Sequence, residues 1–238
     1  MATYDDRYTR AFPTHRDTDV VARFMRGVYG WMCGGLALTA GTAWIVSSSR
    51  ALVAAIFGNP IIFWALVIAQ LGIVFTLSAR VNRMAASTAA MLFAAYSVLT
   101  GVTLSSILLV FTGESVVTTF IVTAGMFGAL AMYGTVTRRD LSGVGQFLFM
   151  GLIGLVLASL IGIFWHNDGL QFMISVVGVL VFAGLTVYDA QRLKSLAFAT
   201  SAGPTGGATV VGALTLYLDF INLFLFLLRF LGNRRDDW

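Results

Sequence analysis

Residues 210–231 read VVGALTLYLDFINLFLFLLRFL, an unbroken apolar run with Asp219 near its middle. A helix of about 20 apolar residues is long enough to cross a bilayer. Leu170–Tyr188 forms a similar run, and Asp189 follows it directly. A carboxylate at membrane depth is costly unless it is paired, protonated or in contact with water. The two aspartates therefore indicate an ion path, a proton relay or a catalytic pair.

The composition is that of a membrane protein. Of the 238 residues, 58% are hydrophobic and 11% are charged, whereas a soluble domain has about 25% charged residues. Seven continuously apolar runs predict seven membrane-spanning helices rather than barrel strands, which would alternate. The predicted spans are Val28–Val46, Ile61–Ala79, Ala85–Phe111, Val116–Val136, Phe147–Phe164, Leu170–Tyr188 and Val210–Leu231. We expect an N-terminal tail (1–26), one membrane domain (27–232) and a C-terminal tail (233–238).

The basic residues predict the orientation of the chain. Eleven of them lie in the N-terminal tail and in the second, fourth and sixth connections, whereas the opposite connections carry Arg50 alone. Because cytoplasmic segments are enriched in Lys and Arg, we expect a cytoplasmic N-terminus. Seven spans then place the C-terminus outside, although Arg234 and Arg235 would favour the cytoplasm. Since the basic residues are explained by topology, no nucleic-acid partner is expected.

The polar residues of the last predicted span share one helical face. Thr215, Asp219, Asn222 and Arg229 are spaced so that 3.6 residues per turn bring them together, with Phe226 interrupting the stripe. A polar face is costly against lipid. We therefore expect it to line the interior of the bundle or a cavity.

Asp189 and Asp219 are expected to meet near the cytoplasmic side, provided that the last helix begins in the membrane interface. Thr186 shares the face of Asp189. Two carboxylates at close range share a proton and titrate as a coupled unit. Without that proton they would repel or bind a cation such as Ca²⁺, with Arg80 or Arg83 stabilising the ionised form. The structural alternative is that Asp189 reaches the interface and Asp219 bonds to a neighbouring helix.

Other polar and small residues predict packing and capping. Gln70 is expected to form a hydrogen bond to a neighbouring helix, and the four-residue spacing of Ser97, Gly101 and Ser105 predicts close helix packing. Asp140 precedes the fifth span and is expected to act as an acid at the start of that helix.

Several other chemistries lack the residues they need. Cys33 is the one cysteine, so no disulfide can form within the chain. His15 and His166 lie outside the apolar runs, which argues against a zinc site and against a rhomboid-type serine protease. A retinal Schiff base needs a lysine within a helix, but Lys194 lies in a predicted loop. We expect no permanently bound cofactor.

Four segments resemble signatures of the Bax inhibitor-1 family, and the details are most similar to bacterial members. They are YSVLTGVTLS (96–105), YGTVTRRDLS (133–142), FAGLTVYDAQ (182–191) and GALTLYLDFINLFLFLLR (212–229). The resemblance extends from about Phe24 to Gly232. It implies an all-α membrane protein, a bundle of seven transmembrane helices with a central last helix.

The resemblance also implies a pH-sensitive cation leak, chiefly of Ca²⁺, gated by paired aspartates that map onto Asp189 and Asp219. The family's arginine on the second helix maps onto Arg80 or Arg83, whereas Gln70 stands where some relatives carry an acid. We therefore expect a non-enzymatic channel or transporter of a bacterial inner membrane. The bilayer, protons and Ca²⁺ are its expected partners.

Two other functions stay open. A non-catalytic regulator of a membrane protease, or of a stress or cell-death pathway, would act through a membrane-protein partner. An intramembrane aspartyl protease also uses two aspartates on helices 6 and 7, and Tyr188-Asp189 matches one of its motifs. In that class glycines precede the second aspartate, but here Leu216-Tyr217-Leu218 precede Asp219. Proteolysis is therefore the weaker alternative.

Overall fold

The computed structural model describes residues 15–80, 84–165, 167–199 and 206–235. Its helices are α1 (His15–Ser48), α2 (Arg50–Phe57), α3 (Pro60–Arg80), α4 (Ala86–Val110), α5 (Gly113–Val136), α6 (Ser142–Phe164), α7 (Asp168–Ala199) and α8 (Gly206–Leu231). The predicted all-α membrane fold is confirmed, because six helices are long and apolar enough to cross a membrane. The bent pair of α1 and α2 makes a seventh span if it is counted as one.

Some predictions fall outside the described residues. They concern Arg83, most of the N-terminal tail and the end of the C-terminal tail. Within the described ranges, the only β-pairing is an isolated bridge between Phe111 and Arg234.

Two helices are longer than their apolar runs. α1 begins at His15 because the segment before Val28 is amphipathic, and its Phe24 and Met25 are buried in the core. α7 continues past Asp189 to Ala199 for the same reason. The prediction that Lys194 lies in a loop is therefore wrong.

The short helix α2 was not predicted as a separate element. It follows a bend of 100° after α1. Ser49 caps it, since its side-chain oxygen accepts a hydrogen bond of 3.4 Å from the Leu52 backbone nitrogen.

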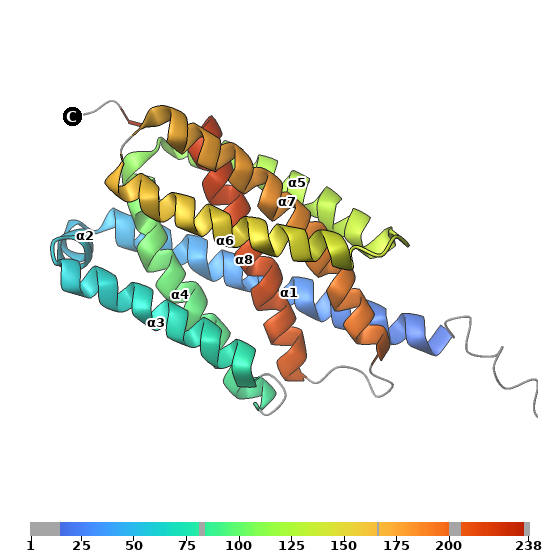
Figure 1. Cartoon of the computed structure of the whole chain (residues 1–238). Helices are drawn as coiled ribbons and strands as arrows, with labels where there is room; N and C mark the ends of the chain where they lie inside the picture. The colour runs from blue at the N-terminus through green and yellow to red at the C-terminus, as the bar shows by residue number, and fades with distance from the viewer. Residues whose placement is uncertain (1–14, 81–83, 166, 200–205, 236–238) are drawn as a thin grey trace, which may run out of the picture.

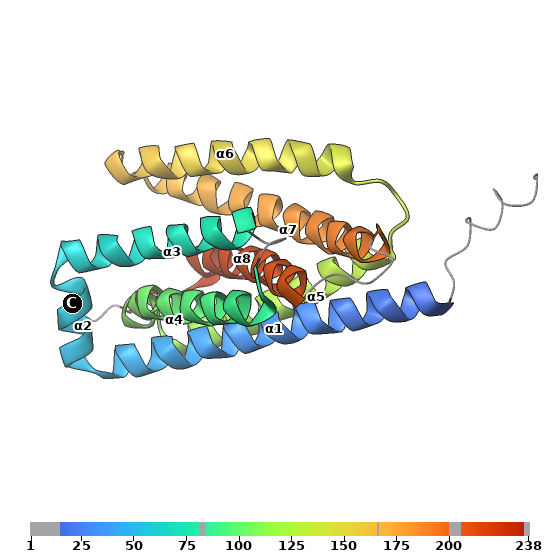
Figure 2. The same ribbon diagram turned by 90° about the horizontal axis from the view of Figure 1, so that it is seen from below.

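The last helix, α8, packs against α1, α4, α5 and α7. Figure 1 shows it crossing the bundle, and Figure 2 shows it between α1 and the pair formed by α6 and α7. It is the most buried candidate span. Of the residues in its most apolar stretch 61% are buried, compared with 6% in α3. By contrast, α3 packs on α2 and α4, and α6 packs on α7.

Tyr217 of α8 joins three helices. Its ring is fully buried and meets the rings of Phe93 and Tyr96 edge-on, at centroid distances of 5.6 and 5.8 Å. Its hydroxyl lies 2.6 Å from Oγ1 of Thr39, which is 2.9 Å from the carbonyl oxygen of Ser97. Packing and hydrogen bonds together therefore tie α8 to α1 and α4.

The predicted packing residues lie at helix contacts. A Cβ on Gly101 would stand 2.6 Å from the carbonyl oxygen of Thr39, and Ser97 and Ser105 are fully buried, which confirms close packing of α4 on α1. Gln70 of α3 donates from Nε2 to the carbonyl oxygen of Leu99 in α4, at 3.4 Å, so the predicted interhelical hydrogen bond is also confirmed.

Candidate functional site

The lengths of α7 and α8 bring the two aspartates to similar depths. Ten residues of α7 follow Asp189, and thirteen residues of α8 precede Asp219. At about 1.5 Å per residue the depths differ by roughly one helical turn. α8 also begins at Gly206 rather than at Val210. The early start of α8 thus lets Asp219 reach nearly the depth of Asp189, as a meeting of the two aspartates requires.

The carboxyl groups of Asp189 and Asp219 lie within hydrogen-bonding range of each other. Both side chains are buried, with Asp189 8% and Asp219 5% exposed. Among the described residues, no hydrogen-bond donor reaches Oδ2 of Asp219. A hydrogen bond between two carboxyl groups requires a proton on one of them. With no proton, the pair carries two like charges at close range in a poorly solvated place.

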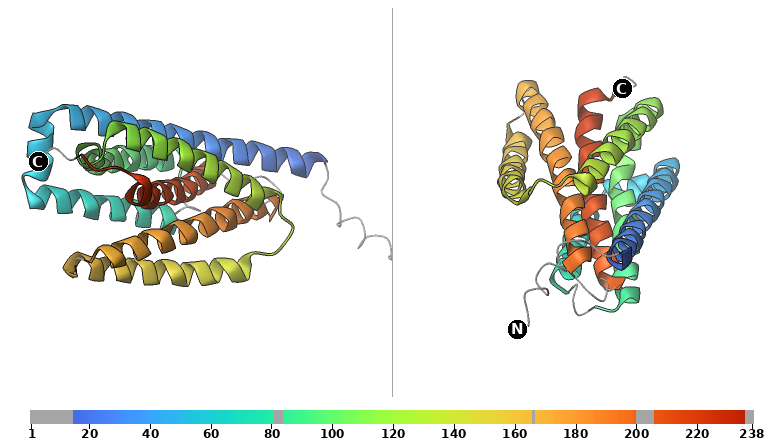
Figure 3. Two further views of the ribbon diagram at one scale, coloured as in Figure 1. Left: turned by 90° about the horizontal axis from the view of Figure 1, so that it is seen from above. Right: turned by 90° about the vertical axis from the view of Figure 1, so that its right-hand side faces the viewer.

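The pair lines a pocket of about 630 Å³, which we call the aspartate pocket. Its walls come from α6, α7 and α8. Thr215 and Asn222 of α8 line it beside Asp219, so the predicted polar face does border a cavity. The right-hand view of Figure 3 shows α6 at the edge of the bundle, on the far side of α7 from α1. The α6 wall is therefore the outer wall of the pocket.

The supporting polar residues are not equivalent. Oγ1 of Thr215 donates to the carbonyl oxygen of Val211 at 3.2 Å, and Nδ2 of Asn222 donates to that of Leu218 at 2.8 Å. Thr186 is fully buried, and its hydroxyl donates to the carbonyl oxygen of Phe182 at 2.8 Å. All three side chains thus donate to a carbonyl oxygen of their own helix, and they differ in that Thr215 and Asn222 line the aspartate pocket whereas Thr186 does not.

The cation beside the pair is Arg192, which the sequence analysis did not select. Its Nη1 lies 4.0 Å from Oδ1 of Asp189, and its side chain is 70% exposed. Such an exposed pair is worth about 0–1 kcal/mol. The three-residue spacing would have identified it if the helix had been predicted to continue past Asp189. Arg80 is exposed in the last turn of α3, where it forms no ion pair with any described residue, so its tuning role stays a prediction.

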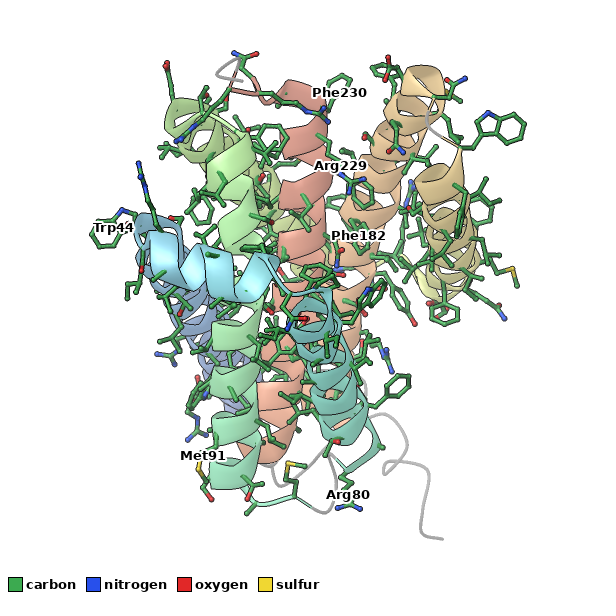
Figure 4. All side chains as sticks on the ribbon, turned by 90° about the vertical axis from the view of Figure 1, so that its left-hand side faces the viewer. Trp44, Arg80, Met91, Phe182, Arg229 and Phe230 are labelled. Atoms are coloured by element: carbon green, nitrogen blue, oxygen red, sulfur yellow. The ribbon has the colours of Figure 1, made fainter. Side chains whose placement is uncertain are left out.

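Phe226 closes the aspartate pocket on the side toward the end of α8. Its ring stacks on Phe182 with a centroid distance of 5.8 Å and an interplanar angle of 24°. Gly178 leaves room for this ring, because a Cβ there would lie 2.5 Å from it. The guanidinium carbon of Arg229 lies over the Phe226 ring, 5.9 Å from the ring centroid. Figure 4 shows Arg229 in the half of the bundle away from Arg80, with Phe182 nearer the middle.

Arg229 belongs to a second pocket, of about 480 Å³. This pocket also contains Asp168, Gln171 and Ser175 from the start of α7. Phe226 and Arg229 are one helical turn apart, so the aromatic stack lies between the two pockets.

Comparison with known proteins identifies the family. The sequence pattern described as "Inhibitor of apoptosis-promoting Bax1" matches residues 21–236. The chain belongs to the Bax inhibitor-1 family. Both aspartates, both pockets and the aromatic stack lie inside the part that matches the Bax inhibitor-1 pattern.

The relatives of this Bax inhibitor-1 chain include bacterial membrane proteins. Inner membrane protein YbhL of Escherichia coli is 48% identical over 233 residues, which are 97% of this chain and 100% of YbhL. A protein of Borreliella burgdorferi is 44% identical over 217 residues, covering 90% of this chain and 94% of that protein. A protein of Rickettsia prowazekii is 42% identical over 242 residues, covering 99% and 100%. The protein is thus a multipass membrane protein similar over nearly its whole length to a bacterial inner membrane protein.

Proposed function

We propose that this protein is a pH-sensitive cation leak channel or transporter of a bacterial inner membrane, with Ca²⁺ as its main ion. The observation that carries the proposal is the contact between Asp189 and Asp219 at the wall of the aspartate pocket. Both residues lie inside candidate membrane spans, where an unpaired carboxylate is costly. Retaining two of them side by side favours a role in binding protons or cations.

In this proposal the pair is a proton-operated latch. With one shared proton, the hydrogen bond between the carboxyl groups holds α7 to α8. Without it, two like charges repel strongly because few water molecules screen them. The helices then separate, or a cation takes the place of the proton. The role is non-catalytic, since the pair binds and releases a proton and does not activate water.

The path that we propose runs from the aspartate pocket to the second pocket. Between them it passes the stack of Phe226 on Phe182, which is an apolar constriction of the kind that excludes water and ions. Beyond it, Asp168 offers a carboxylate and Arg229 a positive charge. A fixed positive charge beside the path is expected to keep cation flow slow, as suits a leak.

The membrane arrangement is part of the same proposal. α1 with α2 forms the first of seven spans, α8 is the central helix on which α1, α4, α5 and α7 pack, and the N-terminus is cytoplasmic. The excess of basic residues on the N-terminal side supports this orientation. The aspartate pocket then lies in the cytoplasmic half of the bundle, where protons and Ca²⁺ of the cytoplasm have the shorter route.

The test is Ca²⁺ flux into liposomes that contain the purified protein, scanned across pH. We expect wild-type flux to depend on pH and both Asp189→Asn and Asp219→Asn to flatten this dependence, because an amide keeps the shape and loses the titrating group. Asp140→Asn, an exposed acid outside the pocket, is the matched control and should retain the wild-type response.

Wild-type flux equal to that of empty liposomes at every pH would end the leak proposal. The regulatory function would then be the next to test, by isolating proteins that purify together with the chain.

A further inference from the structure

We propose that the aspartate pocket binds an amphiphilic organic cation, with a primary ammonium group on Asp189 and Asp219 and an apolar tail along α6. This goes beyond the leak of inorganic ions, although it uses the same two carboxylates.

The aspartate pocket holds a buried acceptor that receives no hydrogen bond from the described residues. Asp219 is 5% exposed, lines the pocket, and no described donor reaches its Oδ2. A buried acceptor left without a donor is unfavourable, and a charged donor to a carboxylate gives one of the stronger hydrogen bonds in proteins. An ammonium group carries three donors and one positive charge. It can therefore satisfy Asp219 and bridge to Asp189 in place of the shared proton.

The wall of the pocket on α6 suits an apolar tail. The pocket residues supplied by α6 are mainly large and apolar, and Phe149, Val156 and Leu160 are each more than half exposed on the outside of the bundle. These side chains extend the wall to the surface that faces lipid. A ligand with a hydrocarbon or aromatic tail could thus enter from the bilayer and keep its tail in apolar surroundings while its charge reaches the acids.

The number of strong acceptors in the pocket also suits an ammonium group. A hard divalent ion seeks six to eight oxygen ligands. The described pocket residues provide two carboxylates and the weaker side-chain oxygens of Ser159, Tyr188, Thr215 and Asn222, so a divalent ion passing through would keep part of its water shell. An ammonium group is satisfied by two or three acceptors, which this pocket has. Its volume of about 630 Å³ also falls in the range of small-molecule sites.

The ionisable groups around the pocket fit a monovalent cation. α7 contributes Tyr188, Asp189 and Arg192, α8 contributes Asp219, and the pocket residues of α6 are not ionisable. Arg192 is mostly exposed and lies at the mouth, so the inner end is acidic. Binding of the ammonium group to the pair is expected to release the shared proton, about one proton per bound amine.

The experiment is a fluorescence titration of the full-length protein in nanodiscs with dansylcadaverine, a primary alkylammonium that carries an aromatic fluorophore. We expect saturable binding with proton release in weakly buffered solution. Asp219→Asn and Asp189→Asn should each weaken binding about 10- to 100-fold, the usual value of a charge-assisted hydrogen bond. Tetraphenylphosphonium has similar charge and lipophilicity but no N–H donor, and should compete poorly.

A second pair of variants tests the tail without touching the acids. Val156→Trp fills the pocket from its outer wall and should weaken binding, whereas Leu157→Trp, on the same helix but outside the pocket lining, should not. This pair decides the question if an aspartate variant fails to fold, as judged by size-exclusion chromatography.

Three results would overturn the inference. They are fluorescence equal to that of empty nanodiscs, unchanged affinity in both folded aspartate variants, and equal competition by tetraphenylphosphonium. The leak is measured separately as Ca²⁺ flux. Flux without amine binding removes this inference alone, and amine binding without flux removes the proposed leak alone.

Discussion

The hydroxyl of Tyr217 links α8 to α1 by one buried hydrogen bond. Its partner, Oγ1 of Thr39, is 2.6 Å away in a fully buried region. Tyr217→Phe keeps the ring but leaves Thr39 without this partner, so we expect a loss of about 1–2 kcal/mol in the free energy of unfolding. Thermal unfolding in detergent measures this. Tyr133→Phe removes a hydroxyl at a side chain that is 55% exposed and is the control. Equal melting temperatures for Tyr217→Phe and wild type would show that the bond contributes nothing.

Asp140 behaves differently from the pocket aspartates because it is exposed and already has donors. The backbone nitrogen and Oγ of Ser142 donate to its Oδ1 at 2.9 and 2.6 Å, and these bonds hold the pKa of Asp140 below its usual range. A group with a lowered pKa contributes its stabilisation above its unfolded pKa and loses it as the pH falls through the folded pKa.

The contribution of Asp140 is therefore constant between about pH 5 and 8 and disappears only in stronger acid. We expect Asp140→Asn to leave the pH dependence of Ca²⁺ flux unchanged in that range. Hydrogen exchange of the Ser142 amide reports on the start of α6. At neutral pH this amide should exchange faster in the variant than in the wild type, and in strong acid the two exchange rates should be equal. A variant that alters the flux response at neutral pH would mean that charge outside the pocket controls the leak.

At the scale of elements, α7 and α8 close against each other where Phe226 fills the space over Gly178 and stacks on Phe182. Removing this ring in Phe226→Ala opens the constriction between the two pockets. We expect a severalfold higher Ca²⁺ flux at every pH, because an apolar constriction limits flow by excluding water. The measurement is the liposome assay. Phe75→Ala, on α3 and 73% exposed, lies outside both pockets and should not change the flux. An unchanged or lower flux in Phe226→Ala would place the barrier elsewhere.

Element positions could be predicted where a helix is apolar throughout, and not where an amphipathic stretch continues it. The apolar run of α7 ends at Tyr188, but the helix goes on because Leu193 and Ala197 are buried on one face. The charged residues Arg192 and Lys194 therefore made this part of the helix look like a loop in the sequence. Because the helix was predicted to end at Tyr188, the proximity of Arg192 to Asp189 was not predicted either.

The aspartate pair could be predicted because an acid in an apolar run is conspicuous in any sequence. The wall formed by α6 could not, because α6 contributes ordinary apolar residues whose part in a pocket depends on where the helix packs. Phe226 was seen in the sequence only as a break in a polar stripe, and its stacking partner on α7 required the structure.

At the scale of the whole molecule, the outer surface matches a lipid environment. α3 and α6 lie at the edge and expose large apolar side chains, including Ile61, Phe75 and Phe147 at more than 70%. In water such a surface would be a liability, whereas in a bilayer it needs no polar cover. The buried polar groups gather instead around α8.

The whole-molecule arrangement ties the C-terminus to the connection between α4 and α5. The backbone nitrogen of Thr112 donates to the carbonyl oxygen of Asn233 at 3.1 Å, and that of Arg235 donates to Val110 at 3.0 Å. Oγ of Ser115 accepts from the backbone nitrogen of Asn233 at 3.0 Å. The C-terminal segment must therefore lie on the same side of the membrane as this connection, which is the outer side in the orientation that we propose.

We expect alkaline phosphatase fused after Trp238 to be active in bacterial cells and green fluorescent protein fused there to stay dark. Fusions after Arg139, in the connection between α5 and α6, should behave in the opposite way and serve as the control. Because Arg234 and Arg235 by themselves would favour the cytoplasm, the outcome depends on whether the backbone pairing and the number of spans outweigh two charges. A fluorescent C-terminal fusion would place the end of α8 inside. Because the hydrogen bonds keep the α4–α5 connection on the same side as the C-terminus, that connection would also be inside. The proposed orientation of the entire bundle would then have to be reversed.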